Sequence, residues 1–309
     1  MGAGVRVVFL GNASWSIPSL EALAQSRHEI VRVVTRVPRP APRGRGVVPT
    51  PVADSGRRLS LPVAEVETVK SGSGFELLRS ARPDVLVVVA YGEILRPEVL
   101  SIPAVAPVNL HFSLLPELRG PAPVQRALLE GMVSTGVTTL IMDQGVDTGP
   151  ILLQATEQIH DEDDAGTLGG RLAAVGARLL VDTLDRMEAG DARPIPQDEA
   201  RATYAPKIED REIDWTESPE RIVNLVRALA PEPGAVTRWR GRPLRILSAR
   251  PVEGSGLPGA VVRSDRRGFA VGANDGAVAP LDVVPAGRKR MAAGEFVRGH
   301  RPAVGETLG

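Results

Sequence analysis

Two polar side chains, Asn109 and His111, end an apolar run that predicts a β-strand over 105–111. Because side chains alternate along a strand, both project from the same face and can reach one atom of a substrate. An open α/β sheet binds its ligands beyond the carboxyl ends of its strands, where this pair falls. An Asn amide can donate a hydrogen bond and a His ring can carry a proton, so the pair is a candidate for chemistry at that atom.

Other interpretations of the same residues have to be weighed. By spacing alone, a His beside an Asn at a strand end is more often a hydrogen-bonded structural pair than a catalytic one. A metal site is less favoured, because the other histidines (His28, His160 and His300) show no ligand spacing with His111 and the chain has no cysteine. A serine-hydrolase site at Ser113 is disfavoured because the glycine-flanked nucleophile elbow is missing.

The longer motif around this pair changes the balance. It reads Asn109-Leu-His111-Phe-Ser113-Leu-Leu-Pro116-Glu-Leu-Arg119-Gly120, followed by Pro123, and it resembles the signature of the formyltetrahydrofolate-dependent formyltransferases. That family uses an Asn, a His and an Asp. The Asp matches a second segment, Asp143-Gln-Gly-Val-Asp147-Thr-Gly149, which on its own is typical of an ordinary turn. The presence of both motifs in one chain argues against a chance match.

The resemblance implies a role for each matched residue. Asn109, His111 and Asp147 are expected to be catalytic, and Ser113, Leu114, Leu115 and Pro116 are expected to contact the folate. Attack of an amine on a formyl carbonyl builds an oxyanion and a charged nitrogen. The Asn109 amide and a protonated His111 can donate to the oxygen, and Asp147 can favour the charged imidazole and accept the amine proton through water. No metal is required, because the folate carries the activated one-carbon unit.

The N-terminal half alternates apolar runs with helix-like segments, which favours a parallel sheet covered by helices. A buried run such as 84–89, DVLVVV, is typical of a strand covered on both faces. The further expected strands are 5–10, 30–35, 105–111, 136–142 and 151–159, the last two forming a hairpin around the turn at 143–150. Helices are expected at 18–26, 75–81, 123–130 and 167–188, the last because Leu168, Leu172, Val175, Leu179 and Met187 recur at helical spacing.

The C-terminal part has a different organisation. Residues 189–217 are polar and proline-bearing, which is typical of a connection between domains. One helix at 219–228 is followed by short strand-like runs separated by Gly and Pro, which predict a small β-barrel. We therefore expect a Rossmann-like α/β formyltransferase domain over 1–188, a linker over 189–217, and an OB-like β-barrel domain over 218–309 that binds tRNA.

Segments outside the catalytic motifs distinguish between branches of the family, which act on glycinamide ribonucleotide, nucleotide-linked amino sugars or methionyl-tRNA. The chain resembles the methionyl-tRNA formyltransferases over nearly its whole length. The matching segments are Ile17–Leu23, Tyr204–Lys207, Ile213–Trp215, Pro233–Ala235, Gly287–Met291 and Phe296–Gly299. The resemblance implies transfer of a formyl group from 10-formyltetrahydrofolate to the amino group of methionyl-initiator tRNA. A nucleotide-amino-sugar formyltransferase that uses the same donor is the alternative.

Three positions depart from the family pattern. Gly11-Asn12-Ala13 stands where the family has Gly-Thr-Pro, so this first loop is expected to have a different shape from that of the family. Phe112 replaces a common Pro, and Pro150 replaces a common acidic residue. None of these changes removes a catalytic candidate.

The net charge is zero, but the basic residues are unevenly distributed. Eight arginines lie between Arg27 and Arg58 against two acidic residues, and thirteen Arg and Lys lie between Gly234 and Arg301 against five. The loop with Arg39, Arg43 and Arg45 resembles the basic loop with which the family grips the tRNA acceptor stem. The composition of this loop alone is also typical of a solvated Arg/Pro connector. Its basic residues on a flexible Gly/Pro backbone equally suit contacts with nucleic-acid phosphates, and together with the basic C-terminal part they favour a tRNA-binding loop.

Composition limits the remaining classes. The absence of cysteine excludes disulfides and thiolate catalysis, and the N-terminus lacks the features of a signal peptide, so a soluble cytoplasmic protein is expected. A dehydrogenase is disfavoured because the glycine fingerprint is missing. An RNA-binding protein on a degenerate scaffold should have lost a member of the catalytic set, and all three are present. We expect a monomer that binds initiator tRNA and 10-formyltetrahydrofolate and no membrane.

Overall fold

The computed structural model describes residues 4–38 and 48–309. By its internal contacts the chain divides into two compact units. The first comprises the residues up to Pro123 together with Thr135–Gln158 and Gly169–Ala205. The second comprises Val124–Ser134, Ile159–Leu168 and Pro206–Gly309.

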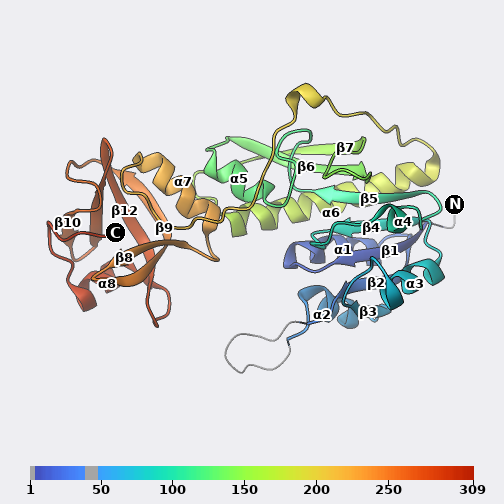
Figure 1. Ribbon diagram of the computed structural model, residues 1–309, viewed down its shortest axis with the longest axis horizontal. Helices are drawn as coiled ribbons and strands as arrows, with labels where there is room; N and C mark the ends of the chain where they lie inside the picture. Colours follow the sequence, from blue (N-terminus) through green and yellow to red (C-terminus); the bar gives the residue numbers. More distant parts are fainter. Residues whose placement is uncertain (1–3, 39–47) are drawn as a thin grey trace. The chain divides into compact units, whose positions relative to one another are not determined.

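The first unit is built on a seven-stranded sheet with the order β3-β2-β1-β4-β5-β6-β7 (Figure 1). Neighbouring strands from β3 to β5 are parallel, and β6 runs antiparallel to β5. This arrangement confirms the predicted α/β class. The strands are β1 (Arg6–Gly11), β2 (Glu29–Arg36), β3 (Val63–Val66), β4 (Val85–Val89), β5 (Ala106–His111), β6 (Ser134–Ile141) and β7 (Ile151–Gln158).

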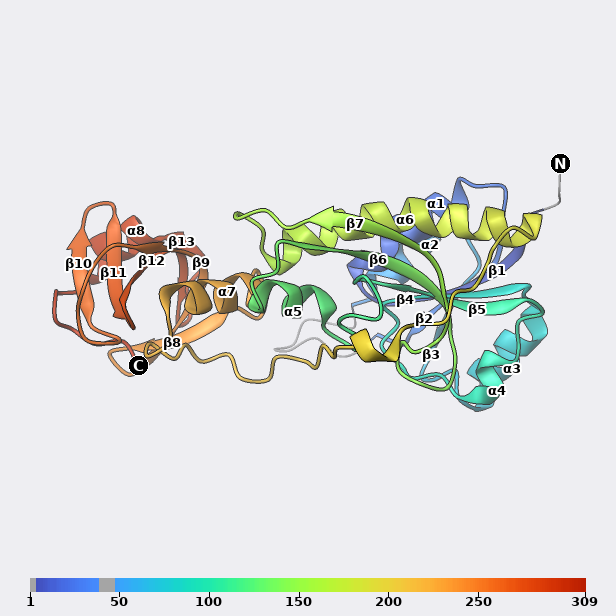
Figure 2. The same ribbon diagram turned by 90° about the horizontal axis from the view of Figure 1, so that it is seen from above.

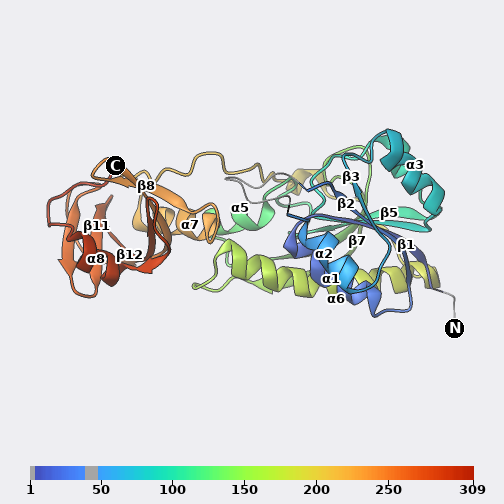
Figure 3. The same ribbon diagram turned by 90° about the horizontal axis from the view of Figure 1, so that it is seen from below.

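Helices cover both faces of this sheet. Helices α1 and α6 lie on one face, and α3 and α4 lie on the other (Figures 2 and 3). Alternate residues of the central strands, such as Leu10 and Leu86, pack against Leu78 of α3 in one apolar cluster. The helices of this unit are α1 (Ile17–Ala24), α2 (Pro51–Arg58), α3 (Gly72–Ala81), α4 (Pro97–Leu100) and most of α6 (Ala165–Ala189), with 3₁₀ turns η1 (Ser14–Ser16) and η2 (Glu199–Arg201). Helix α5 (Pro123–Leu129) falls almost wholly in the second unit.

Helix α2 was not expected from the sequence, because its 8 residues are mostly polar and too few to show a helical period. It begins after Thr50, whose side chain accepts a hydrogen bond from the backbone N–H of Ala53, and has Pro51 at its first position. Arg57 and Arg58 at its end pair with Glu65 and Glu21. These two arginines of the basic N-terminal stretch are therefore engaged within the protein.

The second unit contains an antiparallel sheet with the order β10-β11-β12-β9-β8, with β13 paired to β12. Its core joins Phe269 and Val271 to Val226 of α7 and Phe296 of α8. The elements are α7 (Pro219–Leu229), β8 (Ala235–Trp239), β9 (Arg242–Val252), β10 (Val261–Asp265), β11 (Gly268–Ala273), β12 (Gly276–Pro285), β13 (Met291–Ala292) and α8 (Ala293–His300).

The last residues of the chain join the two edges of this second sheet. Leu308 forms a bridge with Trp239 at the end of β8, and Thr307 forms one with Ala260 next to β10. The C-terminal segment thus pairs with both outer strands, which is the way a barrel removes its open edges. Within the described part of the chain, no helix has the length and apolar character needed to cross a membrane.

Candidate active site

The expected catalytic residues meet at the carboxyl edge of the first sheet. Strand β5 ends at His111, and Asn109 lies two residues earlier on the same face. Asp147 comes from the turn between β6 and β7, 38 residues after Asn109. The antiparallel pairing of β5 with β6 places Ile141, where β6 ends, beside Val108, and the turn that follows brings Asp147 to Asn109 and His111.

The carboxylate of Asp147 contacts both partners. Asn109 Nδ2 donates to Oδ1 over 3.2 Å, and His111 Nδ1 lies 3.5 Å from Oδ2. The backbone N–H of Gly120 also donates to Oδ2, over 2.8 Å. His111 is buried, and the side chain of Asp147 is 15% exposed. The three side chains form one cluster around the carboxylate that is largely shielded from bulk water.

The second ring nitrogen of His111 has its own partner. Nε2 lies 2.9 Å from the carbonyl oxygen of Leu118. A carbonyl oxygen only accepts hydrogen bonds, so Nε2 carries a proton in this contact. At 3.5 Å, Nδ1 is too far from Asp147 for a good hydrogen bond, whereas a positive ring there is stabilised by the carboxylate. The second amide hydrogen of Asn109 remains for a substrate oxygen.

The turn that carries Asp147 has a constrained backbone. Asp147 has a φ of 55°, in the left-handed region, which costs a non-glycine residue on the order of 1 kcal/mol. A Cβ on Gly149 would lie 1.8 Å from the carbonyl oxygen of Ile141, so only glycine fits there. Asp143 Oδ1 accepts from the N–H of Gly145 and from Thr148 Oγ1. The motif's Asp and Gly positions are thus explained by the geometry of the turn.

The predicted folate-contacting residues form a tight turn after β5. Ser113, Leu115 and Pro116 are buried, and Leu114 is partly exposed. The hydroxyl of Ser113 donates to the carbonyl oxygen of Glu117 over 2.6 Å, so it serves the turn itself. Of these four side chains, Leu114 has the most surface for a ligand, and the others shape the backbone.

Two residues that the sequence analysis missed hold this turn from the neighbouring strands. Thr138 Oγ1 accepts from the N–H of Leu115 over 3.1 Å and donates to the carbonyl of Ser113 over 2.7 Å. Gln154 Nε2 donates to the carbonyl of Leu115 and to Thr138 Oγ1. These contacts join residues 16 to 39 positions apart, so no local pattern indicates them.

Comparisons with known proteins agree with this geometry. A family model described as Formyl transferase matches residues 5–184, and one described as Formyl transferase, C-terminal domain, matches 207–301. A methionyl-tRNA formyltransferase of Roseiflexus sp. (strain RS-1) is 43% identical over 310 residues, covering 99% of this chain and 95% of its own. The chain belongs to the methionyl-tRNA formyltransferase family.

Solved structures share the fold at low sequence identity. HypX from Aquifex aeolicus in complex with tetrahydrofolic acid has a TM-score of 0.64 at 18% identity. The match covers 98% of this chain and 48% of HypX, so the chain spans about half the length of that protein. An N-formyltransferase from Helicobacter canadensis, in complex with folinic acid and dTDP-3-aminofucose, has a TM-score of 0.64 at 17% identity and covers 89% of this chain and 98% of its own.

The Gly11-Asn12-Ala13 segment has a structural role at the edge of the first sheet. Asn12 Oδ1 accepts from Thr35 Oγ1 and from the backbone N–H of Arg36, each over 2.8 Å, and its Nδ2 donates to the carbonyl of Tyr91. Asn12 therefore ties together the carboxyl ends of β1 and β2 and the segment after β4. The side chain thus supplies contacts that hold this edge of the sheet.

The predicted tRNA-contacting residues Arg39, Arg43 and Arg45 lie outside the described residues. The residues that flank them are well tied. Thr35 Oγ1 lies 2.7 Å from Thr50 Oγ1, so the end of β2 and the start of α2 are joined by a hydrogen bond.

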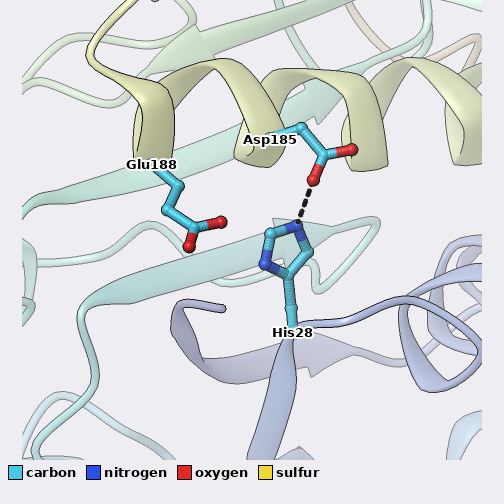
Figure 4. Close-up of side chains that lie close together, drawn as sticks. All are labelled: His28, Asp185 and Glu188. Atoms are coloured by element: carbon cyan, nitrogen blue, oxygen red, sulfur yellow. Dashed lines mark ion pairs between the residues drawn. The ribbon is translucent and has the colours of Figure 1, made fainter. Parts of the chain in front are cut away.

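A second cluster of titratable groups lies away from β5. Atoms of His28, Asp185 and Glu188 lie within 4.8 Å of one another, the carboxylates coming from α6 (Figure 4). His28 Nδ1 accepts from the N–H of Val5, so the single proton of the neutral ring is on Nε2, 3.4 Å from Asp185. Nε2 then offers no lone pair to a cation. Arg27 pairs with both carboxylates at 2.7 and 2.8 Å, which further disfavours a metal.

Burial dominates the protonation of His28. Its side chain is fully buried, and this lowers the pKa from the ordinary value of 6.5, against the opposing effect of Asp185. The cluster therefore has a structural role: a neutral His28 connects Val5, just before β1, with Asp185 near the end of α6.

Proposed function

We propose that this protein transfers the formyl group of 10-formyltetrahydrofolate to the amino group of methionyl-initiator tRNA, for translation initiation. The observation that carries the proposal is the convergence of Asn109, His111 and Asp147 on one edge of the sheet, in a chain that matches its relatives over nearly their full length. Folate and tRNA are both substrates in this reaction, and the proposal includes no resident metal.

The chemistry requires few protein groups. The methionyl nitrogen attacks the formyl carbon, a new C–N bond forms, and the bond from that carbon to N10 of the folate breaks. The second amide hydrogen of Asn109 and Nδ1–H of His111 are the donors for the oxygen that becomes negative. The Asp147 carboxylate, 3.5 Å from the ring, stabilises the charged imidazole. The carboxylate also takes up the amine proton through water. The proton is then passed to N10 of the folate as the bond from N10 to the formyl carbon breaks.

We assign the formyl donor to the turn at Ser113, Leu114, Leu115 and Pro116. This turn begins two residues after His111, so a folate on it presents its formyl group to the catalytic set. The partly exposed Leu114 offers an apolar surface, and the contacts from Thr138 and Gln154 keep the turn rigid. A rigid binding surface preserves the alignment of the reacting atoms.

We assign tRNA binding to Arg39, Arg43 and Arg45 and to the basic C-terminal part. In this proposal the catalytic domain spans 1–188, the linker 189–217 and the tRNA-binding domain 218–309. The thirteen basic residues between Gly234 and Arg301 suit phosphate contacts. We further propose that the protein is a cytoplasmic monomer.

The alternative is formyl transfer to a nucleotide-linked amino sugar, which is favoured by the structural similarity to the Helicobacter canadensis N-formyltransferase. At 17% identity this similarity extends to the fold alone. A single assay separates the two: purified protein receives labelled 10-formyltetrahydrofolate with charged initiator tRNA, glycinamide ribonucleotide or dTDP-3-aminofucose in parallel. Methionyl-tRNA should be formylated fastest. Faster transfer to the amino sugar would reject the tRNA assignment and keep the chemistry.

A further inference from the structure

The segment 197–205 lies alongside residues 116–122, the part of the signature that contacts the catalytic group. Backbone hydrogen bonds join Arg119 N–H to the carbonyl of Thr203 over 2.9 Å and Ala205 N–H to the carbonyl of Arg119 over 2.7 Å. Thr203 Oγ1 also accepts from the N–H of Leu118 over 2.8 Å. Leu118, whose carbonyl faces His111, has a φ of 59°. Such a conformation is rare for a bulky residue and persists only where its surroundings fix it.

A fully buried guanidinium connects this segment to the signature. Arg119 is 1% exposed, and its Nε and Nη2 donate to Gln197 Oε1 over 3.0 and 2.8 Å. Its Nη1 and Nη2 also donate to the carboxylate of Glu199, over 2.9 and 2.8 Å. The hydrogen bonds to Glu199 raise the pKa of Arg119 above its ordinary value. The charged guanidinium thus donates four hydrogen bonds to Gln197 and Glu199, and it fixes which end of the Gln197 amide faces it.

The other end of that amide reaches the turn of Asp147. With Oε1 taken by Arg119, Gln197 Nε2 donates to the carbonyl of Asp147 over 2.8 Å and to the carbonyl of Gly149 over 2.7 Å. Both amide hydrogens are used. Gln197 thus holds the backbone of a residue in the left-handed region, while Gly120, next to Arg119, holds its side chain.

We propose that Gln197, oriented by Arg119, is a positioning residue for formyl transfer: it fixes the Asp147 backbone so that the carboxylate meets Asn109 and His111. The inference rests on the proposed function, because it concerns the same reaction. Gln197 donates to the backbone carbonyls of Asp147 and Gly149, so its effect passes through the conformation of Asp147. Loss of its two hydrogen bonds lets the turn relax and moves the carboxylate from its partners.

Two substitutions test this role. Gln197→Met keeps the length of the side chain and removes both polar ends. Gln197→Glu keeps an acceptor for Arg119 and replaces the donor with a carboxylate oxygen, which repels the two carbonyls. Both should lower kcat by roughly 10- to 100-fold, the effect of a misplacement of about 1 Å, with KM for both substrates changed less than about threefold. Gln25→Met, the same change at an exposed glutamine after α1, should retain wild-type kcat.

A double-mutant cycle separates positioning from general stabilisation. In a protein that carries Asp147→Ala, there is no carboxylate left to position, so adding Gln197→Met should lower single-turnover rates less than about twofold further. A purely structural role predicts the same loss in both backgrounds, with a matching drop in Tm. Wild-type kcat in either Gln197 variant, a change in KM alone, or full additivity would overturn the inference. A wild-type protein that formylates no methionyl-tRNA would instead reject the proposed function.

Discussion

The backbone N–H of Gly120 donates a hydrogen bond of 2.8 Å to Oδ2 of Asp147. This bond joins the two sequence motifs directly, since Gly120 closes the first and Asp147 belongs to the second. It also leaves the carboxylate with fixed contacts on both oxygens, because Asn109 donates to Oδ1. A charged acceptor with several donors is held more firmly than a free turn residue. Asp147 is therefore held in place by groups of the protein itself.

Asp147→Asn should separate the charge of this group from its shape. The amide keeps the size of the side chain and one oxygen acceptor, but it removes the negative charge beside His111 and the capacity to take up a proton. We expect kcat to fall by roughly 10²-fold or more, as for loss of a general acid–base group. Steady-state kinetics with both substrates give the measurement. An unchanged kcat would exclude a catalytic role for the carboxylate.

Asn109→Ala and His111→Ala should each act on the transition state more than on binding. Removal of one donor to the oxyanion lowers kcat by roughly 10²-fold or more. Circular dichroism should show that both variants fold, because strand β5 retains its backbone pairing with β4 and β6. If either variant raises KM and leaves kcat near the wild-type value, the role assigned to that residue is wrong.

Thr138→Val should weaken the turn proposed to hold the formyl donor. The variant loses the acceptor for Leu115 N–H and the donor to the Ser113 carbonyl, which costs roughly 1–3 kcal/mol of unfolding free energy. We expect a raised KM for 10-formyltetrahydrofolate. The control is Thr139→Val, since Thr139 is equally buried but bonds to Thr183 of α6. An equal rise in KM in both variants would mean general destabilisation.

The sequence predicts the shared face of Asn109 and His111 because the two-residue period of a strand is a local property. It also predicts strand β5, which carries both residues, to within one residue at its start. Asp147 was identified through the resemblance of two motifs, since an isolated Asp before Thr-Gly is typical of a turn. Its contacts with Asn109 depend on the pairing of β5 with β6, which is not local.

Arg119 and Gln197 illustrate what the sequence could not predict. A charged residue is expected at the surface, yet Arg119 is buried because Gln197 and Glu199, 78 and 80 positions later, accept four hydrogen bonds from it. Neither partner has a periodic or motif signal, and both lie in a segment that composition marks as a connection. The tertiary fold, which pairs residues 116–122 with residues 203–205, brings these groups together, and no local pattern indicates it.

His28 makes stability depend on pH in one direction. Burial lowers its pKa in the folded protein, so the unfolded chain binds the proton more readily below the ordinary value of 6.5. Above pH 6.5, His28 is neutral in both states and does not reduce the stability of the fold. As the pH falls from 6.5 towards the lower pKa of the folded protein, the unfolded chain takes up the proton first and the free energy of unfolding decreases. His28→Asn retains an acceptor for Val5 N–H and cannot titrate, so its unfolding free energy should fall less steeply between about pH 7.5 and 5.

A second substitution checks the sign. Asp185 opposes the lowering of the His28 pKa, so Asp185→Asn should make the loss of stability with falling pH steeper. Urea unfolding at several pH values measures both effects. A pH dependence identical in the wild type and His28→Asn would show that His28 does not contribute.

Replacement of Arg39, Arg43 and Arg45 by Ala tests the proposed contacts with the tRNA acceptor stem. If the three side chains bind phosphates, the triple variant should bind tRNA more weakly, and the log–log dependence of affinity on salt should flatten by at most about one unit per lost contact. Folate affinity should be unchanged, because the turn at 113–116 is held by Thr138 and Gln154. Identical salt slopes for the variant and the wild type would reject the contacts. A parallel loss of folate binding would place the effect of the mutations in the catalytic domain and reject the assignment of these arginines to tRNA alone.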